Sequence, residues 1–254
     1  MTTLEGTPNP EAPNPQLPVV QKLRIRYAKR GRLRFTSHRD FGRAFERAVR
    51  RAAIPIGFSS GVSPHPKISY ANASPTGAAS EAEYLEIGMT TACDPDEVRV
   101  ALDAALPEGL DIVDVVIAQP GALADRLEAS AWQIALPGVE PERAAHAVEI
   151  FVATDEIPVE RMMKRGLRTF DCRAAVLGLS ARSGEDAGGP CAILDVVVRH
   201  DTPSVRPDDV LAGLRSSGGL ELEQTPIATR LAQGPLDMKT GTVGDPLAFD
   251  RDAS

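Results

Sequence analysis

Two histidines in the N-terminal third of the chain, His38 and His65, are the side chains best suited to chemistry at neutral pH. Imidazole has an unperturbed pKa of about 6.5, so it can donate or accept a proton there. Together with Lys67 and Tyr70, the two histidines could carry out acid–base cleavage or modification of RNA, provided that all four side chains converge on one atom. The structural alternatives are a helix cap or a core-edge hydrogen bond for His38 and an ordinary turn between two prolines for His65.

Positive charge is concentrated in the same part of the chain. Thirteen of the 28 Lys and Arg residues lie between Lys22 and Lys67, where only Asp40 and Glu46 are acidic, so this segment carries about +11 in a chain whose net charge is −7. A strongly basic segment in an acidic protein indicates a site for a polyanion, either RNA or a phosphate-bearing ligand. The residues that we predict to contact nucleic acid or another anion are Arg32, Arg34, His38, Arg39, Arg43, Arg47, Ser60, His65, Lys67, Tyr70, Lys164 and Arg173.

A strand, a helix and a loop have to position these side chains. Apolar and basic residues alternate from Gln21, which predicts a strand or hairpin with one basic face. After a capping-box-like start at Ser37, apolar residues recur at helical spacing up to Pro55, and arginines line another face. The N-terminus of such a helix favours an anion, although an arginine stripe is also typical of a solvated surface helix. A loop rich in Gly, Ser and Pro, residues 57–66, then leads to the next strand.

Two further observations bear on the extent of the anion surface. The aromatic residues of the basic segment, Phe35 among them, are assigned to the core, so we expect none of the stacking aromatics that RNA-recognition motifs use. In the second half, a smaller basic group that includes Lys164 and Arg173 falls on a predicted hairpin. That group either extends the anion surface or discourages edge-to-edge pairing of strands.

The order of the elements predicts an α+β fold. Each half reads as strand, helix, strand, strand, helix and strand, which is the ferredoxin-like βαββαβ order with an antiparallel sheet and helices on one face. No residue-level repeat accompanies the duplication, so the tandem arrangement rests on element order alone. The expected organisation is a disordered leader (1–19), a basic ferredoxin-like domain (20–120), a second ferredoxin-like domain (121–232) and a disordered tail (233–254).

The amino-acid composition limits which cellular compartment and which cofactors are expected for this chain. The chain has three scattered cysteines, Cys93, Cys172 and Cys191, which predict a reducing, cytoplasmic location and no disulfide framework. No closely spaced Cys or His cluster is present, so we expect no metal or cofactor bound by this chain. The Pro-rich N-terminus lacks an apolar run, and no stretch approaches the roughly 18 apolar residues that a membrane span needs. The glycines match no phosphate-binding loop.

The block RFTSHRDFGRAFERAVRRAAIPIGFSSGVSPHPKISYANASPTGAASEAEYLEI, residues 34–87, closely resembles the radical-SAM-associated bacterial domain family of unknown function, in its standalone form. The resemblance weakens but persists through IPVERMMKRGLRTFDCR, residues 157–173. It implies association with a radical SAM protein and a role in RNA processing, RNA modification or ribosome biology. The CxxxCxxC motif is missing here, so that partner would carry the 4Fe–4S cluster and S-adenosylmethionine. The family has no established reaction, and hence no catalytic residues to carry over.

Three functions remain open from the sequence. The leading hypothesis is a non-catalytic RNA-binding or substrate-presenting protein that works with a radical SAM enzyme. The second is an autonomous endoribonuclease or RNA-modifying enzyme that uses His38 and His65. The third is a protein-interaction module whose basic face meets an acidic partner. The sequence does not fix the oligomeric state, and it predicts no membrane contact.

Overall fold

The N-terminal half of the chain folds in the predicted order of elements. The computed structural model describes residues 17–186 and 189–253, so most of the predicted leader lies outside the described part of the chain. The elements of this half are β1 (Gln21–Lys29), the 3₁₀ turn η1 (Gly31–Phe35), α1 (His38–Arg51), β2 (Ile68–Ala71), β3 (Ala79–Met89), α2 (Pro95–Ala105) and β4 (Leu110–Ile117).

Helix α1 forms where the sequence predicts it. The side chain of Ser37 caps the helix, since its Oγ accepts the N–H of Asp40 at 3.2 Å. Phe41 and Phe45 face the sheet and are 2 % and 0 % exposed, whereas the arginines of the helix point to solvent. Burial of this apolar face stabilises the helix and leaves its basic face free.

The C-terminal half repeats the order with an insertion. A two-stranded hairpin lies between the first helix and the second strand of this half, and it packs on the last long helix. The elements are η2 (Leu123–Arg126), β5 (Ala129–Leu136), α3 (Pro141–Ala153), β6 (Pro158–Met163), β7 (Gly166–Asp171), β8 (Val176–Asp186), β9 (Gly189–Arg199), α4 (Pro207–Gly218) and β10 (Ile227–Gly234).

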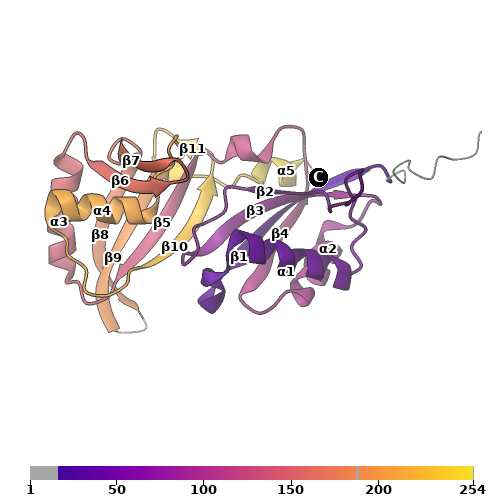
Figure 1. Cartoon of the computed structure of the whole chain (residues 1–254), viewed down its shortest axis with the longest axis horizontal. Coiled ribbons are helices and arrows are strands. Elements are labelled where there is room, and N and C mark those ends of the chain that lie inside the picture. Colours follow the sequence, from indigo (N-terminus) through magenta and orange to yellow (C-terminus); the bar gives the residue numbers. More distant parts are fainter. Residues whose placement is uncertain (1–16, 187–188, 254) are drawn as a thin grey trace, which may run out of the picture.

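One sheet runs through both halves (Figure 1). Its strand order is β4-β1-β3-β10-β5-β9-β8, and β2 pairs with β3 beside this path. All neighbours are antiparallel except β10 and β3, which are parallel and meet only at Thr229–Ala79 and Arg230–Ser80. The chain is therefore an α+β protein with a largely antiparallel sheet, as predicted. The two halves were expected to have separate sheets, but β10 joins them.

The helices of each half cover one face of the sheet (Figure 1). In the first half, Phe45, Leu85 and Leu102 belong to the core beneath α1 and α2. Adjacent residues of a strand point to opposite faces, so Tyr84, next to Leu85, lies on the other side. There it packs in a smaller cluster with residues of η2 and of the C-terminal segment, including Leu247. The second half has its own core beneath α3 and α4.

The predicted disordered tail, residues 233–254, is wrong for the part that the structure describes. Residues 235–253 form a short hairpin of β11 (Leu236–Asp237) and β12 (Thr242–Val243), followed by α5 (Ala248–Asp252). The hairpin contacts β5 and β10 of the second half, whereas Leu247 and α5 return to the first half and lie on the face opposite α1 and α2 (Figure 1). Its polar composition suggested disorder, but Asp250 pairs with Arg24 and Arg126, and Arg251 pairs with Asp114, all of them far away in the sequence.

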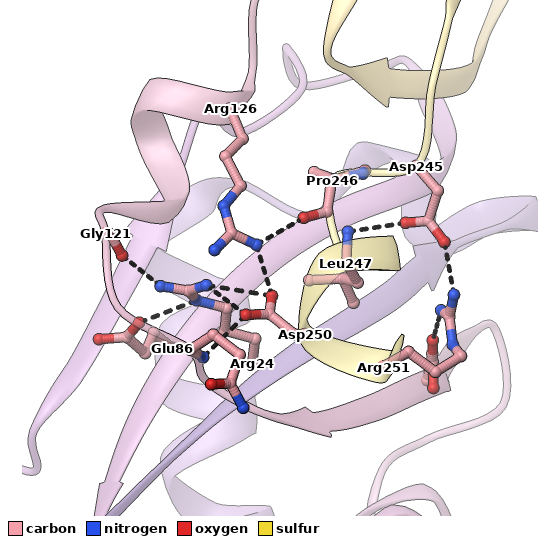
Figure 2. Close-up of polar contacts among 11 residues, drawn as sticks. Arg24, Glu86, Gly121, Arg126, Asp245, Pro246, Leu247, Asp250 and Arg251 are labelled. Carbon is pink, nitrogen blue, oxygen red and sulfur yellow. Dashed lines mark hydrogen bonds and ion pairs between the residues drawn. The ribbon is translucent and has the colours of Figure 1, made fainter. Parts of the chain in front are cut away.

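Asp250 is the centre of that pairing (Figure 2). Its carboxylate is fully buried and accepts hydrogen bonds from Arg24 at 2.7 and 3.0 Å and from Arg126 at 2.7 Å. The backbone N–H of Gln119 donates a further bond at 2.8 Å. Arg24, itself 1 % exposed, also binds Glu86 at 3.1 Å. We refer to Arg24, Glu86, Arg126 and Asp250 as the C-terminal clasp.

Along residues 17–186 and 189–253, no helix is both long enough and apolar enough to cross a membrane.

Candidate nucleic-acid interface

The basic residues of this segment differ in whether carboxylates pair with them. On β1 and just after it, Lys22 and Arg24 pair with Glu86, and Arg30 pairs with Glu81. The three predicted arginines of α1 are all exposed, and none forms an ion pair with any residue in the described ranges. The positive charge that is available to a ligand therefore lies on the helix, not on the predicted basic face of the strand. These arginines are Arg39, Arg43 and Arg47.

Arg32 and Arg34 lie on η1, immediately before α1, and they too form no ion pair with any residue of the described part of the chain. The chain turns there because Gly31 adopts a positive φ of 53°, which ends the strand alternation. As a result, Phe35 is 60 % exposed, and the Arg34 guanidinium carbon lies 4.6 Å from the centre of its ring. The assignment of Phe35 to the core was therefore wrong.

A polar cleft lies where the two halves meet. One cavity, of about 500 Å³, is lined by His38 and the 72–76 loop from the first half and by His200 and Arg206 from the second. A neighbouring cavity of about 320 Å³ includes Arg34 and Phe35. The side chains that line both cavities are Pro75, Thr76, Arg206 and Asp208. We call the two cavities together the junction cleft.

Buried charges form the floor of this cleft. Arg230 on β10 and Glu83 on β3 are each 2 % exposed and form a short ion pair. Arg230 also donates to the backbone oxygen of Asn72 at 2.9 Å, and its guanidinium lies 5.4 Å from the centre of the Trp132 ring. Gln233, fully buried, donates to a backbone oxygen of β3 at 2.7 Å. Sequence reasoning missed this network, whose one local signal is an arginine within the apolar run of β10.

His200 contacts residues from both halves of the chain, Asn72 in the first half and Leu127 and Ser130 in the second. Its Nδ1 lies 2.6 Å from the backbone oxygen of Leu127, and its Nε2 lies 2.6 Å from Oγ of Ser130. A neutral ring that donates through Nδ1 accepts the Ser130 hydroxyl proton at Nε2. A serine bonded to an oriented histidine resembles an activated nucleophile. Ser130 is only 1 % exposed, however, so its hydroxyl serves the packing of the junction.

The pKa of His200 lies below its ordinary value of 6.5, mainly because burial disfavours the charged ring and also because Arg230 is near. The unfolded chain therefore binds a proton at a higher pH than the folded chain, so stability falls as the pH drops below about 6.5. We expect His200→Gln to weaken this decline between pH 7 and pH 5 in urea denaturation. His146→Gln, at an exposed position away from the cleft, provides the control, and an equal change of the pH profile in both variants would contradict the role given to His200.

The structure does not bring His38 and His65 together. His38 lies at the start of α1, where its ring meets Tyr70 edge-on at 4.8 Å. His65 is in the exposed loop whose neighbouring residue, Pro66, lines a small cavity with Glu46 and Arg50 of α1. At 1.5 Å per residue, those positions are about 12–18 Å along the helix from His38. The two imidazoles therefore lie towards opposite ends of α1.

The remaining predicted residues fall into three situations. Ser60 and Lys67 are exposed, Ser60 in the loop that carries His65 and Lys67 just before β2. Burial raises the pKa of Tyr70 to about 12, so its phenol stays protonated at neutral pH. Lys164 is exposed at the tip of the β6–β7 hairpin, where it lines a cavity of about 550 Å³ with other basic residues. Arg173 instead donates to the backbone oxygens of residues 176 and 152, at 3.0 and 3.2 Å.

Potential metal ligands do not cluster in the part of the chain that the structure describes. Within residues 17–186 and 189–253, no three His, Cys, Asp or Glu side chains are grouped so that they could hold a metal ion.

The matched protein family is itself uncharacterized. Residues 22–207, most of the described chain, match the model of a family described as "Uncharacterized protein conserved in bacteria (DUF2344)". The matched region begins in β1 and ends at the first residue of α4, so it includes the arginines of α1 and most of the junction cleft. No curated protein matches the chain.

Proposed function

The chain belongs to the DUF2344 family of uncharacterized bacterial proteins, and from the geometry of its surface we propose that it is a non-catalytic RNA-binding protein. The observation that carries this proposal is a set of arginines beside a cleft that form no ion pair with any described residue, in a chain with net charge −7. These are Arg32 and Arg34 on η1 and Arg39, Arg43 and Arg47 on α1. From Arg39 to Arg47 the stripe extends about 12 Å along the helix, which suits a polymeric anion better than a single phosphate.

The geometry favours binding over catalysis. An acid–base pair has to reach one reacting atom, and His38 and His65 lie towards opposite ends of α1. Tyr70 is a poor proton donor because its pKa is raised to about 12. The alternative of an acidic protein partner would use the same arginines, so it has to be separated from RNA by experiment.

We infer further that the bound RNA is presented to a radical SAM enzyme in the cytoplasm, during RNA processing, RNA modification or ribosome biology. This inference rests on the family resemblance of residues 34–87. The partner, not this chain, would supply the 4Fe–4S cluster and S-adenosylmethionine. The arginines and the cleft would hold the RNA, and the exposed loop that carries His65 would remain available to the partner.

The strand orders also support two ferredoxin-like units. In the first half the pairing order is β4-β1-β3-β2, and in the second it is β10-β5-β9-β8. Each corresponds to the order fourth, first, third, second of a βαββαβ unit. On this interpretation the β6–β7 hairpin is an insertion in the second unit, and the junction cleft lies between the units.

Charge reversal on α1 tests RNA binding. We expect Arg39→Glu/Arg43→Glu to weaken binding of a fluorescein-labelled 12-nucleotide RNA by roughly ten- to hundred-fold at low salt, because two phosphate contacts are lost. The slope of log K against log salt should fall by about 1.4, since each contact on single-stranded RNA contributes about 0.7. Fluorescence anisotropy at several salt concentrations measures both quantities.

The matched control reverses two exposed arginines of the second half, Arg143 on α3 and Arg215 on α4. It changes the net charge by the same amount, so it should have a small effect on affinity and slope. Equal losses in both variants would mean that net charge alone attracts RNA. Absence of binding by the wild-type protein, together with salt-sensitive binding of an acidic peptide, would instead support the protein-partner alternative.

A further inference from the structure

Phe35 is an exposed aromatic residue in an unusual setting. Single exposed apolar residues are common on protein surfaces and need no explanation. Phe35, however, is 60 % exposed, carries the Arg34 guanidinium 4.6 Å from its ring centre and lines the smaller cavity of the junction cleft. An aromatic face next to a guanidinium and an open cavity is the arrangement in which unpaired bases stack on proteins.

The surroundings of Phe35 supply charge for a nucleic-acid backbone. Arg32 and Arg34 lie on the same short turn, and His38 and Arg39 begin the helix that follows. Arg206 reaches the cleft from the second half and forms no ion pair within the described residues. The cleft beside the aromatic ring therefore has cations from both halves of the chain, whereas Lys22 and Arg30 are already paired with Glu86 and Glu81.

Asp208 is a carboxylate that lines both cavities of the junction cleft. Its negative charge determines which part of an RNA could lie beside it. A carboxylate repels phosphate, so it argues against a backbone position at that point of the cleft. It does accept hydrogen bonds from base amino groups, which is how acidic side chains contact cytosine and other amino-bearing bases. Asp208 thus fits the edge of a base better than it fits a phosphate.

We propose that Phe35 and Arg34 form a stacking platform for one unpaired base, so that this chain binds single-stranded RNA in preference to duplex RNA. The inference rests on the proposed RNA binding and specifies the form of RNA that the site takes. The flanking phosphates lie on Arg32 and Arg39, and Asp208 accepts hydrogen bonds from the stacked base. Duplex RNA keeps its bases paired and stacked within the helix, so it cannot use the platform.

The experiment measures anisotropy of the full chain with a labelled 12-nucleotide single strand and with the same strand in a duplex. We expect the wild type to bind the single strand more tightly. Phe35→Ala should weaken single-strand binding by about 5- to 100-fold, the usual effect of losing one stacked base, and should leave duplex binding unchanged. Phe35→Trp, which keeps an aromatic face, should retain the preference. Because Phe35 is exposed, these variants should fold normally, which thermal melting verifies.

Phe249 provides a matched control. It is 61 % exposed and has the Arg126 guanidinium 5.4 Å from its ring centre, but it lies on α5 and lines neither cavity of the junction cleft. Phe249→Ala should leave RNA binding unchanged. If Phe35→Ala binds the single strand as the wild type does, or if the wild type binds both RNAs equally, the stacking platform is refuted while RNA binding survives. If the wild type binds neither RNA, the proposed function itself fails.

Discussion

Glu83→Ala is expected to lower the free energy of unfolding by about 3–5 kcal/mol, because it leaves a buried guanidinium without its counter-ion. Arg230 is 2 % exposed and has Glu83 as its carboxylate partner at the floor of the junction cleft. Lys29 is 5 % exposed, and its pKa is lowered by burial, an effect that the negative charge of Glu83 opposes. Urea denaturation followed by Trp132 fluorescence reports the loss, since that indole packs against Arg230.

Two variants separate this effect from a general sensitivity to mutation. Asp195→Ala removes an ion pair with Arg182 whose side chains are 39 % and 48 % exposed, so it should cost at most about 1 kcal/mol. Glu83→Gln/Arg230→Met removes both charges and should be closer to the wild type than Glu83→Ala, because no unpaired charge stays buried. A cost below 1 kcal/mol for Glu83→Ala would contradict the role given to this pair.

Asp250→Asn should be similarly destabilising, by about 3–5 kcal/mol at pH 7. The carboxylate is fully buried between Arg24 and Arg126, and the amide of asparagine carries no charge to balance them. Asp114→Asn is the control, since Asp114 pairs with Arg251 at a position where the carboxylate is 29 % exposed. Thermal melting of both variants compares them directly. Equal decreases in melting temperature would show that the C-terminal clasp stabilises the protein no more than a partly exposed ion pair does.

The same carboxylate predicts a pH dependence. Burial by itself would raise the pKa of Asp250, but hydrogen bonds from the Gln119 N–H and from Arg24 and Arg126 outweigh it, so the pKa lies below the ordinary 3.8. A lowered pKa means that the stabilisation is present above pH 3.8 and is lost as the pH falls through the folded value. The difference between wild type and Asp250→Asn should therefore be full at pH 5 and shrink below pH 4. A difference that stays constant down to pH 3 would exclude this titration.

The parts of the structure that follow from local periodicity were predicted well. Helix α1, its buried Phe41 and Phe45 and its exposed arginine face all appear in the sequence as a 3.6-residue repeat with a cap at Ser37. The α+β class followed from the order of elements. Local patterns did not predict that Phe35 would be exposed. Gly31 adopts a positive φ, so a 3₁₀ turn forms where the alternation predicted a strand.

Long-range pairing accounts for the other errors. The C-terminal segment is polar in sequence, and it is ordered by contacts with distant residues, such as the ion pair between Asp250 and Arg24, which are more than 220 residues apart. The single sheet depends on two pairs of residues between β10 and β3, and no periodicity within either strand reveals them. The sequence predicted only part of the candidate site, for the same reason. The arginines of α1 belong to one continuous helix, so their pattern is visible in the sequence. The junction cleft was not predicted, because it forms where segments that are distant in the sequence meet.

The position of β10 at the middle of the sheet has a consequence for synthesis of the protein. β10 follows both β3 and β5 in the sequence, so the ribosome makes these two strands before it makes the strand that lies between them in the sheet. Until Ile227 and the residues after it emerge, β5 has an open edge, and Glu83 has no arginine to neutralise it. Open strand edges recruit other strands, so nascent or prematurely terminated chains of this protein should be prone to aggregation and dependent on chaperones.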